Sequence, residues 1–202
     1  LASLPKRQVL GMSDATALLV YLAQQYHWPS VYMANALTFA KEGGLDPEDR
    51  KLILKCLVCG VWPDYLPSLE PFNKSAQLGG QLEGSLCVGN LSIMNISIGD
   101  IWQFDARHKI LLLEDWHEKG HAIWRTLKYF LRIGQLDGVR ALVFGDFLHD
   151  TERVEQVNQI KRLLARFADL VDFPVYQTAA FGHGMNQFPL AFNQQVRYPR
   201  QE

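Results

Sequence analysis

The chain has 202 residues, of which 48% are hydrophobic and 20% are charged. This composition excludes a disordered chain and allows one globular domain or two small ones. Lys and Arg total 20 against 21 Asp and Glu, with no long run of either sign, which argues against nucleic acid or an anionic membrane as the main partner.

Cysteine content and hydropathy bear on the cellular compartment. Cys56, Cys59 and Cys87 are too few and too unevenly spaced for a disulfide framework, which fits a reducing compartment. No apolar stretch reaches roughly 18 uninterrupted residues, and no signal peptide is visible. We therefore expect a cytoplasmic protein without a membrane segment. Because the sequence starts with Leu just before a predicted strand, we also expect it to be a piece of a longer chain.

The first third of the chain alternates between strand and helix patterns. The elements predicted there are a short strand at 7–10, a helix at 16–26, and a helix that begins near Pro47 and ends near Gly60. Residues 61–80 then hold three prolines and end in a glycine pair. Such a stretch is typical of a domain connection or a long surface loop.

The remainder repeats the alternation more strongly. Residues 80–99 are predicted to be part strand and part short helix, followed by strands at 109–115, 139–146 and 173–182 with helices at 122–133 and 151–171 between them. Strands alternating with helices predict an α/β fold with a largely parallel sheet.

Four predicted strands run directly into a polar side chain, namely Ser13, Glu114, Asp146 or His183. In open α/β sheets, ligands bind beyond the carboxyl ends of the strands, where the loops converge. A serine, a histidine and two carboxylates at such ends predict an active site. Asp146 alone is better explained as a structural acid at a strand end.

Ser13 has two interpretations. Ser and Asp before an apolar helical run are what a helix N-terminus needs, and this stretch alone favours a helix cap. Strand, Gly11, one residue, serine and helix is also the layout of a nucleophile elbow, in which the backbone N–H of Asp14 helps to bind an oxyanion. Ala15 stands where such an elbow usually has its second glycine.

Glu114 and His183 have comparable alternatives. A buried carboxylate beside a histidine fixes the imidazole tautomer, although a solvated strand end would also explain Glu114. Gly182 and Gly184 flank His183 and leave its ring accessible, although a turn without function would look the same. Asn90, after Gly89, either donates hydrogen bonds to a ligand or starts a helix after a turn.

Five motifs in this order resemble the serine L,D-carboxypeptidase family, which comprises the muramoyltetrapeptide carboxypeptidases and their microcin-immunity relatives. They are "GMSDATAL" (11–18), "LEGSLCVGNLSIM" (82–94), "ILLLEDWHE" (110–118), "VFGDF" (143–147) and "FGHG" (181–184). The resemblance implies two domains. Residues 1–70 would be the remnant of a Rossmann- or flavodoxin-like N-terminal domain that bears the nucleophile. Residues 71–202 would be a C-terminal α/β domain with a largely parallel sheet.

The resemblance also implies a catalytic triad of Ser13, Glu114 and His183. The expected reaction releases the terminal D-amino acid from a murein tetrapeptide by cleaving its L,D amide bond, during peptidoglycan recycling. It needs no metal and no organic cofactor, and the partner is a muropeptide or another small peptide. Two further residues, Asp14 through its backbone N–H and Asn90, are expected to bind the oxyanion or the substrate. A homodimer is a possible assembly.

Arg125 is the basic residue expected to hold the terminal carboxylate of the substrate. An ion pair with Glu118 would explain this arginine equally well.

Two departures from the family pattern leave alternatives open. Met33 to Asn35 stand where the family usually has a His-Gly-Pro turn, and the family's segment before the serine, with its glycine-rich turn, does not precede Ser13 here. One alternative function is hydrolysis of microcin-type peptidyl or aminoacyl adenylates, which an exposed aromatic side chain near the site would favour. Another is a truncated or degenerate relative that binds muropeptides without catalysis.

Overall fold

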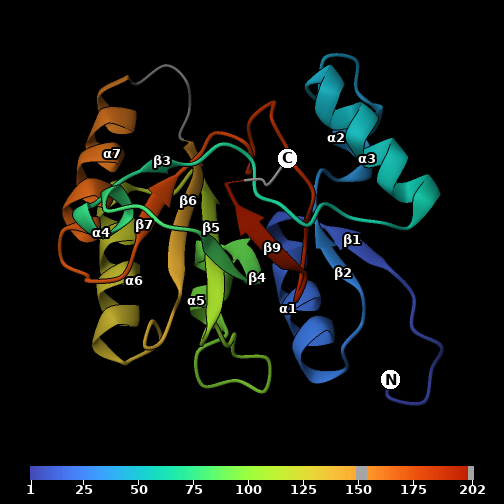
Figure 1. Ribbon diagram of the computed structural model, residues 1–202, viewed down its shortest axis with the longest axis horizontal. Helices are drawn as coiled ribbons and strands as arrows, with labels where there is room; N and C mark the ends of the chain where they lie inside the picture. Colours follow the sequence, from blue (N-terminus) through green and yellow to red (C-terminus); the bar gives the residue numbers. More distant parts are fainter. Residues whose placement is uncertain (149–153, 200–202) are drawn as a thin grey trace.

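The computed structural model describes residues 1–148 and 154–199, which form two β-sheets with helices packed around them (Figure 1). The smaller sheet has the order β1–β2–β8, formed by β1 (Val9–Gly11), β2 (Ser30–Tyr32) and β8 (Leu190–Ala191). β1 and β2 are parallel, and β8 is antiparallel to β2. The first sheet thus includes a short strand from residues 190–191.

The larger sheet has six strands in the order β3–β7–β6–β5–β4–β9. Its strands are β3 (Glu70–Pro71), β4 (Leu82–Asn90), β5 (Lys109–Trp116), β6 (Ala141–Leu148), β7 (Val175–Gln177) and β9 (Gln195–Tyr198). β4, β5, β6 and β7 are parallel, whereas the edge strands β3 and β9 are antiparallel to their neighbours. The predicted α/β fold with a largely parallel sheet is confirmed.

Seven α-helices lie in the described part of the chain: α1 (Thr16–Gln25), α2 (Ala36–Ala40), α3 (Pro47–Cys59), α4 (Lys74–Gln77), α5 (Leu91–Ile96), α6 (Gly120–Arg132) and α7 (Val154–Ala168). A 3₁₀ turn, η1 (Ser13–Ala15), precedes α1. The boundaries of α3 follow from its sequence, because Asp46 caps its first N–H groups and Gly60 ends it at φ +68°. Across these helices, none combines the length and apolar character that crossing a membrane needs.

The predicted strand at 173–182 is longer than the one observed. β7 ends at Gln177, because the next residues leave the sheet and pack over the end of β6, where the Asp146 N–H donates to the Phe181 carbonyl at 2.9 Å. The strands β2, β8 and β9 and the helix α2 have two to five residues each and were not predicted. Residues 151–153 of the predicted helix at 151–171 lie outside the described residues.

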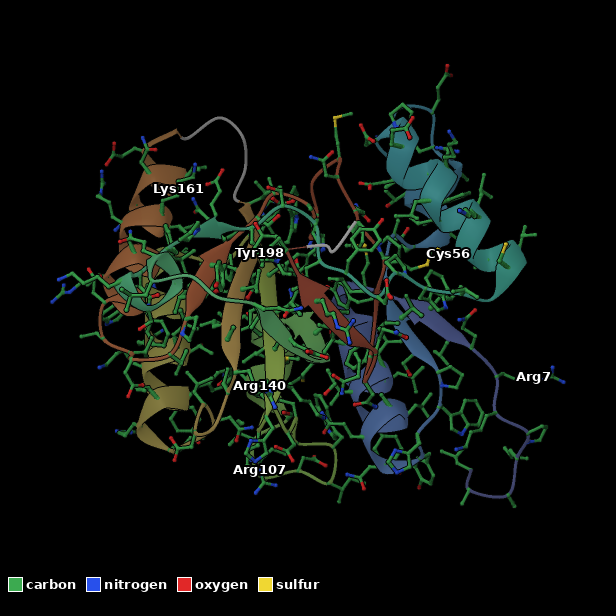
Figure 2. All side chains as sticks on the ribbon, in the orientation of Figure 1. Arg7, Cys56, Arg107, Arg140, Lys161 and Tyr198 are labelled. Atoms are coloured by element: carbon green, nitrogen blue, oxygen red, sulfur yellow. The ribbon has the colours of Figure 1, made fainter. Side chains whose placement is uncertain are left out.

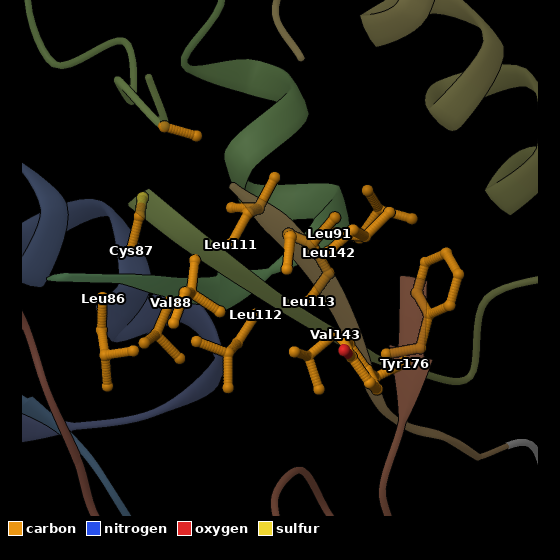
Figure 3. Close-up of a cluster of buried hydrophobic side chains, with 14 of the residues drawn as sticks. Leu86, Cys87, Val88, Leu91, Leu111, Leu112, Leu113, Leu142, Val143 and Tyr176 are labelled. Carbon is orange, nitrogen blue, oxygen red and sulfur yellow. The ribbon is translucent and has the colours of Figure 1, made fainter. Parts of the chain in front are cut away.

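Both faces of the large sheet are buried. Val88, Leu112 and Val143 stand in register across β4, β5 and β6 and point to one side, whereas Leu111 and Leu142 point to the other (Figure 3). All five side chains are at most 1% exposed. This burial explains the uninterrupted apolar run "ILLL", which is typical of a parallel strand covered on both faces.

The same core extends into the first part of the chain. Leu19 and Val20 of α1 and Tyr32 of β2 belong to the cluster that includes the large sheet, and α1 packs against both β2 and β4. The domain boundary predicted near residue 70 stays a prediction.

Arg107 and Arg140 mark the amino-terminal ends of β5 and β6, and the carboxyl ends lie at the opposite edge (Figure 2).

The turn between β1 and α1 depends on a close contact. A Cβ atom placed on Gly11 would lie 2.7 Å from the Cβ atom of Ala15, closer than two carbon atoms can approach without repulsion. Ala15 therefore fits at the position where an elbow usually has a glycine because Gly11 leaves room for its methyl group.

We predict that Gly11→Ala lowers the free energy of unfolding by about 1–3 kcal/mol, because the new methyl group overpacks this contact. The matched variant Gly11→Ala/Ala15→Gly moves the methyl group to the other side and should recover most of the loss. Urea unfolding of both variants measures the effect. A double variant no more stable than Gly11→Ala would contradict the contact.

Candidate active site

Ser13 occupies a strained position between β1 and α1. Its φ is +56°, in the left-handed region that residues other than glycine rarely adopt. Such strain persists only where the surroundings fix it, and it is typical of a serine on a strand-to-helix elbow. The predicted turn at Ser13 is therefore present. Asp14 follows it in η1 and is exposed.

Glu114 and His183 form a buried pair. His183 Nδ1 lies 2.6 Å from Glu114 Oε2, and the side chains are 18% and 0% exposed, respectively. Because a carboxylate can only accept, Nδ1 carries the hydrogen atom in this contact. Nε2, the other ring nitrogen, is then free to act as a base when the ring is neutral.

Tyr32 connects the serine turn to this pair. The backbone N–H of Ser13 donates to Tyr32 Oη at 3.0 Å, and the Tyr32 hydroxyl donates to Glu114 Oε1 at 2.6 Å. Burial and the negative charge of Glu114 raise the pKa of Tyr32 well above its ordinary value, so the hydroxyl stays protonated and donates. Tyr32 was not among the predicted site residues. No local sequence signal identifies it, because β2 has only three residues and the contact with Glu114 spans 82 positions of the chain.

Asn90 also holds Glu114 in place. Its Nδ2 donates to Glu114 Oε1 at 3.2 Å and to Asp115 Oδ1 at 3.1 Å, and its Oδ1 accepts from the Ile93 N–H to cap α5. Neighbouring side chains of a regular strand point to opposite faces, yet both carboxylates contact Asn90. The register between β5 and β6 shifts between Leu113 and Asp115, which explains the irregularity.

The loop that carries His183 packs tightly against the end of β6. The Gly184 N–H donates to Asp146 Oδ2 at 2.9 Å, and a Cβ atom on Gly182 would lie 2.6 Å from the Asp146 Cβ. A Cβ atom on Gly145 would collide with Phe181. The glycines in "FGD" and "FGHG" are therefore required by close approach, and the contact with Gly184 agrees with a structural role for Asp146.

The charges around the pair shift two pKa values. Burial acts to lower the pKa of His183, but the hydrogen bond and charge of Glu114 outweigh it, with Asp115 and Asp146 adding to the effect, so this pKa lies above its ordinary value. Burial and the charge of Glu114 raise the pKa of Asp146 to about 6, although Gly184 and His183 act in the opposite direction.

A cavity of about 520 Å³ opens beside His183. Trp116 lines it and stacks on the His183 ring with a centroid separation of 5.3 Å and an interplanar angle of 25°. The described residues that line it are Met12, Asn35, Leu37, Thr38, Lys41, Gly43, Gly44, Trp116, Leu148, His183, Gly184, Met185 and Gln187. Trp116 was not predicted as a site residue, although it follows Glu114 by only two positions in a strand.

The structure brings together some predicted site residues and separates others. Ser13, Asn90, Glu114 and His183 converge at the carboxyl ends of β1, β4, β5 and β7. Between the described residues, the Ser13 hydroxyl and His183 form no hydrogen bond. Arg125 lies on α6 and lines a separate cavity of about 490 Å³ that also includes Glu118.

The segment Met33 to Asn35 leads from β2 into α2. The Met33 N–H donates to the Gly11 carbonyl at 2.9 Å, and Asn35 Oδ1 caps α2 by accepting from the Thr38 N–H at 2.9 Å. Asn35 also lines the cavity beside His183. Within residues 1–148 and 154–199, no group of three or more His, Cys, Asp or Glu side chains is placed to hold a metal ion.

The fold and the site define an α/β protein with a polar cluster at the carboxyl ends of its parallel strands. Residues 83–198 match the sequence profile of the LD-carboxypeptidase C-terminal domain. The chain therefore belongs to the LD-carboxypeptidase family, as the motifs implied.

Individual proteins extend this similarity. The chain is 34% identical over 186 residues to a predicted carboxypeptidase of Rickettsia conorii, covering 91% of this chain and 56% of that protein. It is 30% identical over 111 residues to the murein tetrapeptide carboxypeptidase of Pseudomonas aeruginosa, covering 53% of this chain and 36% of that protein. It thus spans little more than half the length of the Rickettsia relative.

A solved structure supports the fold. An MccF-like protein from Streptococcus pneumoniae, determined in complex with AMP, superposes with a TM-score of 0.74 at 17% identity. The superposition covers 96% of this chain and 67% of that chain.

If this site hydrolyses a peptide, Tyr32→Phe should reduce that hydrolysis about 10-fold or more, because it removes the acceptor for the Ser13 N–H and one donor to Glu114. The ring still fills its site, so the melting temperature should fall by only a few degrees. Steady-state kinetics and thermal unfolding separate the two effects. Tyr21→Phe is the control, because among residues 1–148 and 154–199 the Tyr21 hydroxyl bonds only to Tyr26. An unchanged kcat in Tyr32→Phe would refute the connection.

Proposed function

We propose that this chain is a serine carboxypeptidase that releases the terminal D-amino acid from a murein tetrapeptide by cleaving the L,D amide bond, in peptidoglycan recycling. The observation that carries the proposal is the buried Glu114–His183 pair, connected through Tyr32 to the backbone of Ser13. Family membership and the murein tetrapeptide relative support it. A cytoplasmic location and a homodimer belong to the same proposal.

In this mechanism Ser13 is the nucleophile and His183 is the general base. His183 Nε2 takes the proton from Ser13 Oγ as the oxygen attacks the scissile carbonyl carbon. The tetrahedral intermediate collapses when His183 gives that proton to the leaving amine, which departs as the free D-amino acid. Water then attacks the acyl-enzyme with His183 again as base, and Ser13 is regenerated.

The other members of the site act on the charge and geometry of this reaction. Glu114 keeps the hydrogen atom on Nδ1 and stabilises the imidazolium that forms when Ser13 gives up its proton. Asn90 acts on Glu114 as a positioning residue, and the N–H of Asp14 supplies part of the oxyanion hole. Catalytic hydrogen bonds often tighten only when the substrate binds, which is consistent with a Ser13 hydroxyl that forms no hydrogen bond to another described residue.

A second candidate function is the hydrolysis of microcin-type peptidyl or aminoacyl adenylates by the same triad. The observation that favours it is Trp116, which is 39% exposed at the cavity beside His183 and presents an aromatic face on which a nucleobase could stack. The MccF-like neighbour was determined with AMP.

The third alternative, a relative that binds muropeptides without catalysis, has no need of a buried Glu–His pair.

We expect Ser13→Ala to reduce turnover of a murein tetrapeptide by at least about 10³-fold while leaving the fold intact, because the nucleophile is lost. A fluorophosphonate probe should label the parent chain at Ser13 and leave the variant unlabelled. Circular dichroism provides the check on folding. Equal turnover by the two proteins would disprove the triad, and absence of labelling in the folded parent would favour the non-catalytic alternative.

Trp116→Ala distinguishes the two substrates. If adenylates are substrates, the variant should lose about 1–3 kcal/mol of binding to an aminoacyl sulfamoyl adenosine, because base stacking is lost. Calorimetric titration of the Ser13→Ala and Ser13→Ala/Trp116→Ala proteins measures this loss. Weak, unchanged binding in both proteins would argue against the adenylate function.

A further inference from the structure

Lys41 is the cation in the cavity beside His183. Among the described residues that line this cavity, it is the only lysine or arginine, and none of them is an aspartate or a glutamate. The Lys41 side chain is exposed and forms no ion pair with the described residues. The cavity therefore offers one uncompensated positive charge, which favours a ligand that ends in an anion.

The walls around Lys41 strengthen such an interaction. Met12, Leu37, Trp116 and Met185 provide apolar surface on the same cavity. Water is less able to screen a charge pair against apolar walls than in the open solvent, so an anion gains more from one lysine here than on an open face.

Hydrogen bonds hold the backbone of Lys41 at the edge of this cavity. The Lys41 carbonyl accepts from the Gly44 N–H at 3.1 Å and from Arg50 Nη2 at 3.0 Å. Gly43 has φ +68°, and a Cβ atom on Gly44 would collide with the Thr38 carbonyl oxygen. The turn from 41 to 44 is therefore tight, and it requires glycine at 44.

The same turn is tied to the segment that follows His183. The Asp46 N–H donates to the Met185 carbonyl at 2.9 Å, and the Gln187 N–H donates to Asp49 Oδ2 at 2.7 Å. The residues on either side of the cavity are therefore held at a set separation. Arg125, the residue expected from the sequence, lines a different cavity and has no contact with this one.

We propose that Lys41 binds the free carboxylate of the substrate's terminal amino acid and so determines selectivity for a free C-terminus. This inference rests on the proposed carboxypeptidase function and names the residue that recognises the substrate's end. The ligand class is a short peptide that ends in an unblocked carboxylate.

The test compares a murein tetrapeptide ending in D-alanine with the same peptide as its C-terminal carboxamide. The parent chain should prefer the free acid. Lys41→Gln should raise KM for the acid about tenfold and change kcat less than about twofold, because only the charge pair is lost. The values of kcat and KM for the carboxamide should stay the same. Lys55→Gln, an exposed lysine on α3 that does not line the cavity, is the matched control and should retain the preference.

A binding experiment separates this inference from the proposed function. Calorimetric titration of Ser13→Ala and Ser13→Ala/Lys41→Gln with the acid and the carboxamide requires no turnover. Loss of the preference for the free acid in the double variant supports the role of Lys41, whether or not the parent is active. An inactive parent would count against the proposed function and leave the role of Lys41 supported. The assignment of Lys41 is overturned if the parent shows no preference for the free acid over the carboxamide. It is also overturned if this preference survives in Lys41→Gln or is lost in Arg125→Gln.

Discussion

The rest of the site depends on the burial of one carboxylate. Glu114 is fully buried at the end of the central strand β5, where an unpaired negative charge would cost several kcal/mol. Donors from three elements compensate it: Tyr32 from β2, Asn90 from β4 and His183 from the loop after β7. The two sheets and the His183 loop are therefore positioned by a shared electrostatic requirement as well as by apolar packing.

The sequence predicts the parts of this arrangement that have a local signal. The run "ILLL" identifies β5 and therefore Glu114 at its end, and the same strand-end argument selects Ser13 and His183. Tyr32 and Lys41 lie in segments with no periodicity, because β2 has three residues and α2 has five. Their roles arise from contacts across the fold, such as the Tyr32–Glu114 bond between residues 82 positions apart. Arg125 shows the converse, since a residue with the expected charge lines a different cavity.

The glycines beside His183 show how a structure refines an argument from residue type. Conformational freedom explains Gly182, whose φ is +128°. It is an insufficient account of Gly184 and Gly145, where a side chain would meet Asp146 or Phe181. The loop is held by close approach of its backbone to β6, and this constraint keeps the His183 ring against Glu114.

The late strands β8 and β9 have a consequence for the order of assembly on the ribosome. β8 pairs with β2 in the sheet that leads into Ser13, and β9 pairs with β4 in the sheet that carries Glu114. Both strands follow His183 in the chain, so neither pairing can form until residues 190–198 have been synthesised. Pairing between segments so distant in sequence is slow to form. In a nascent chain, Ser13 and Glu114 are therefore synthesised well before β8 and β9, the strands that pair beside them.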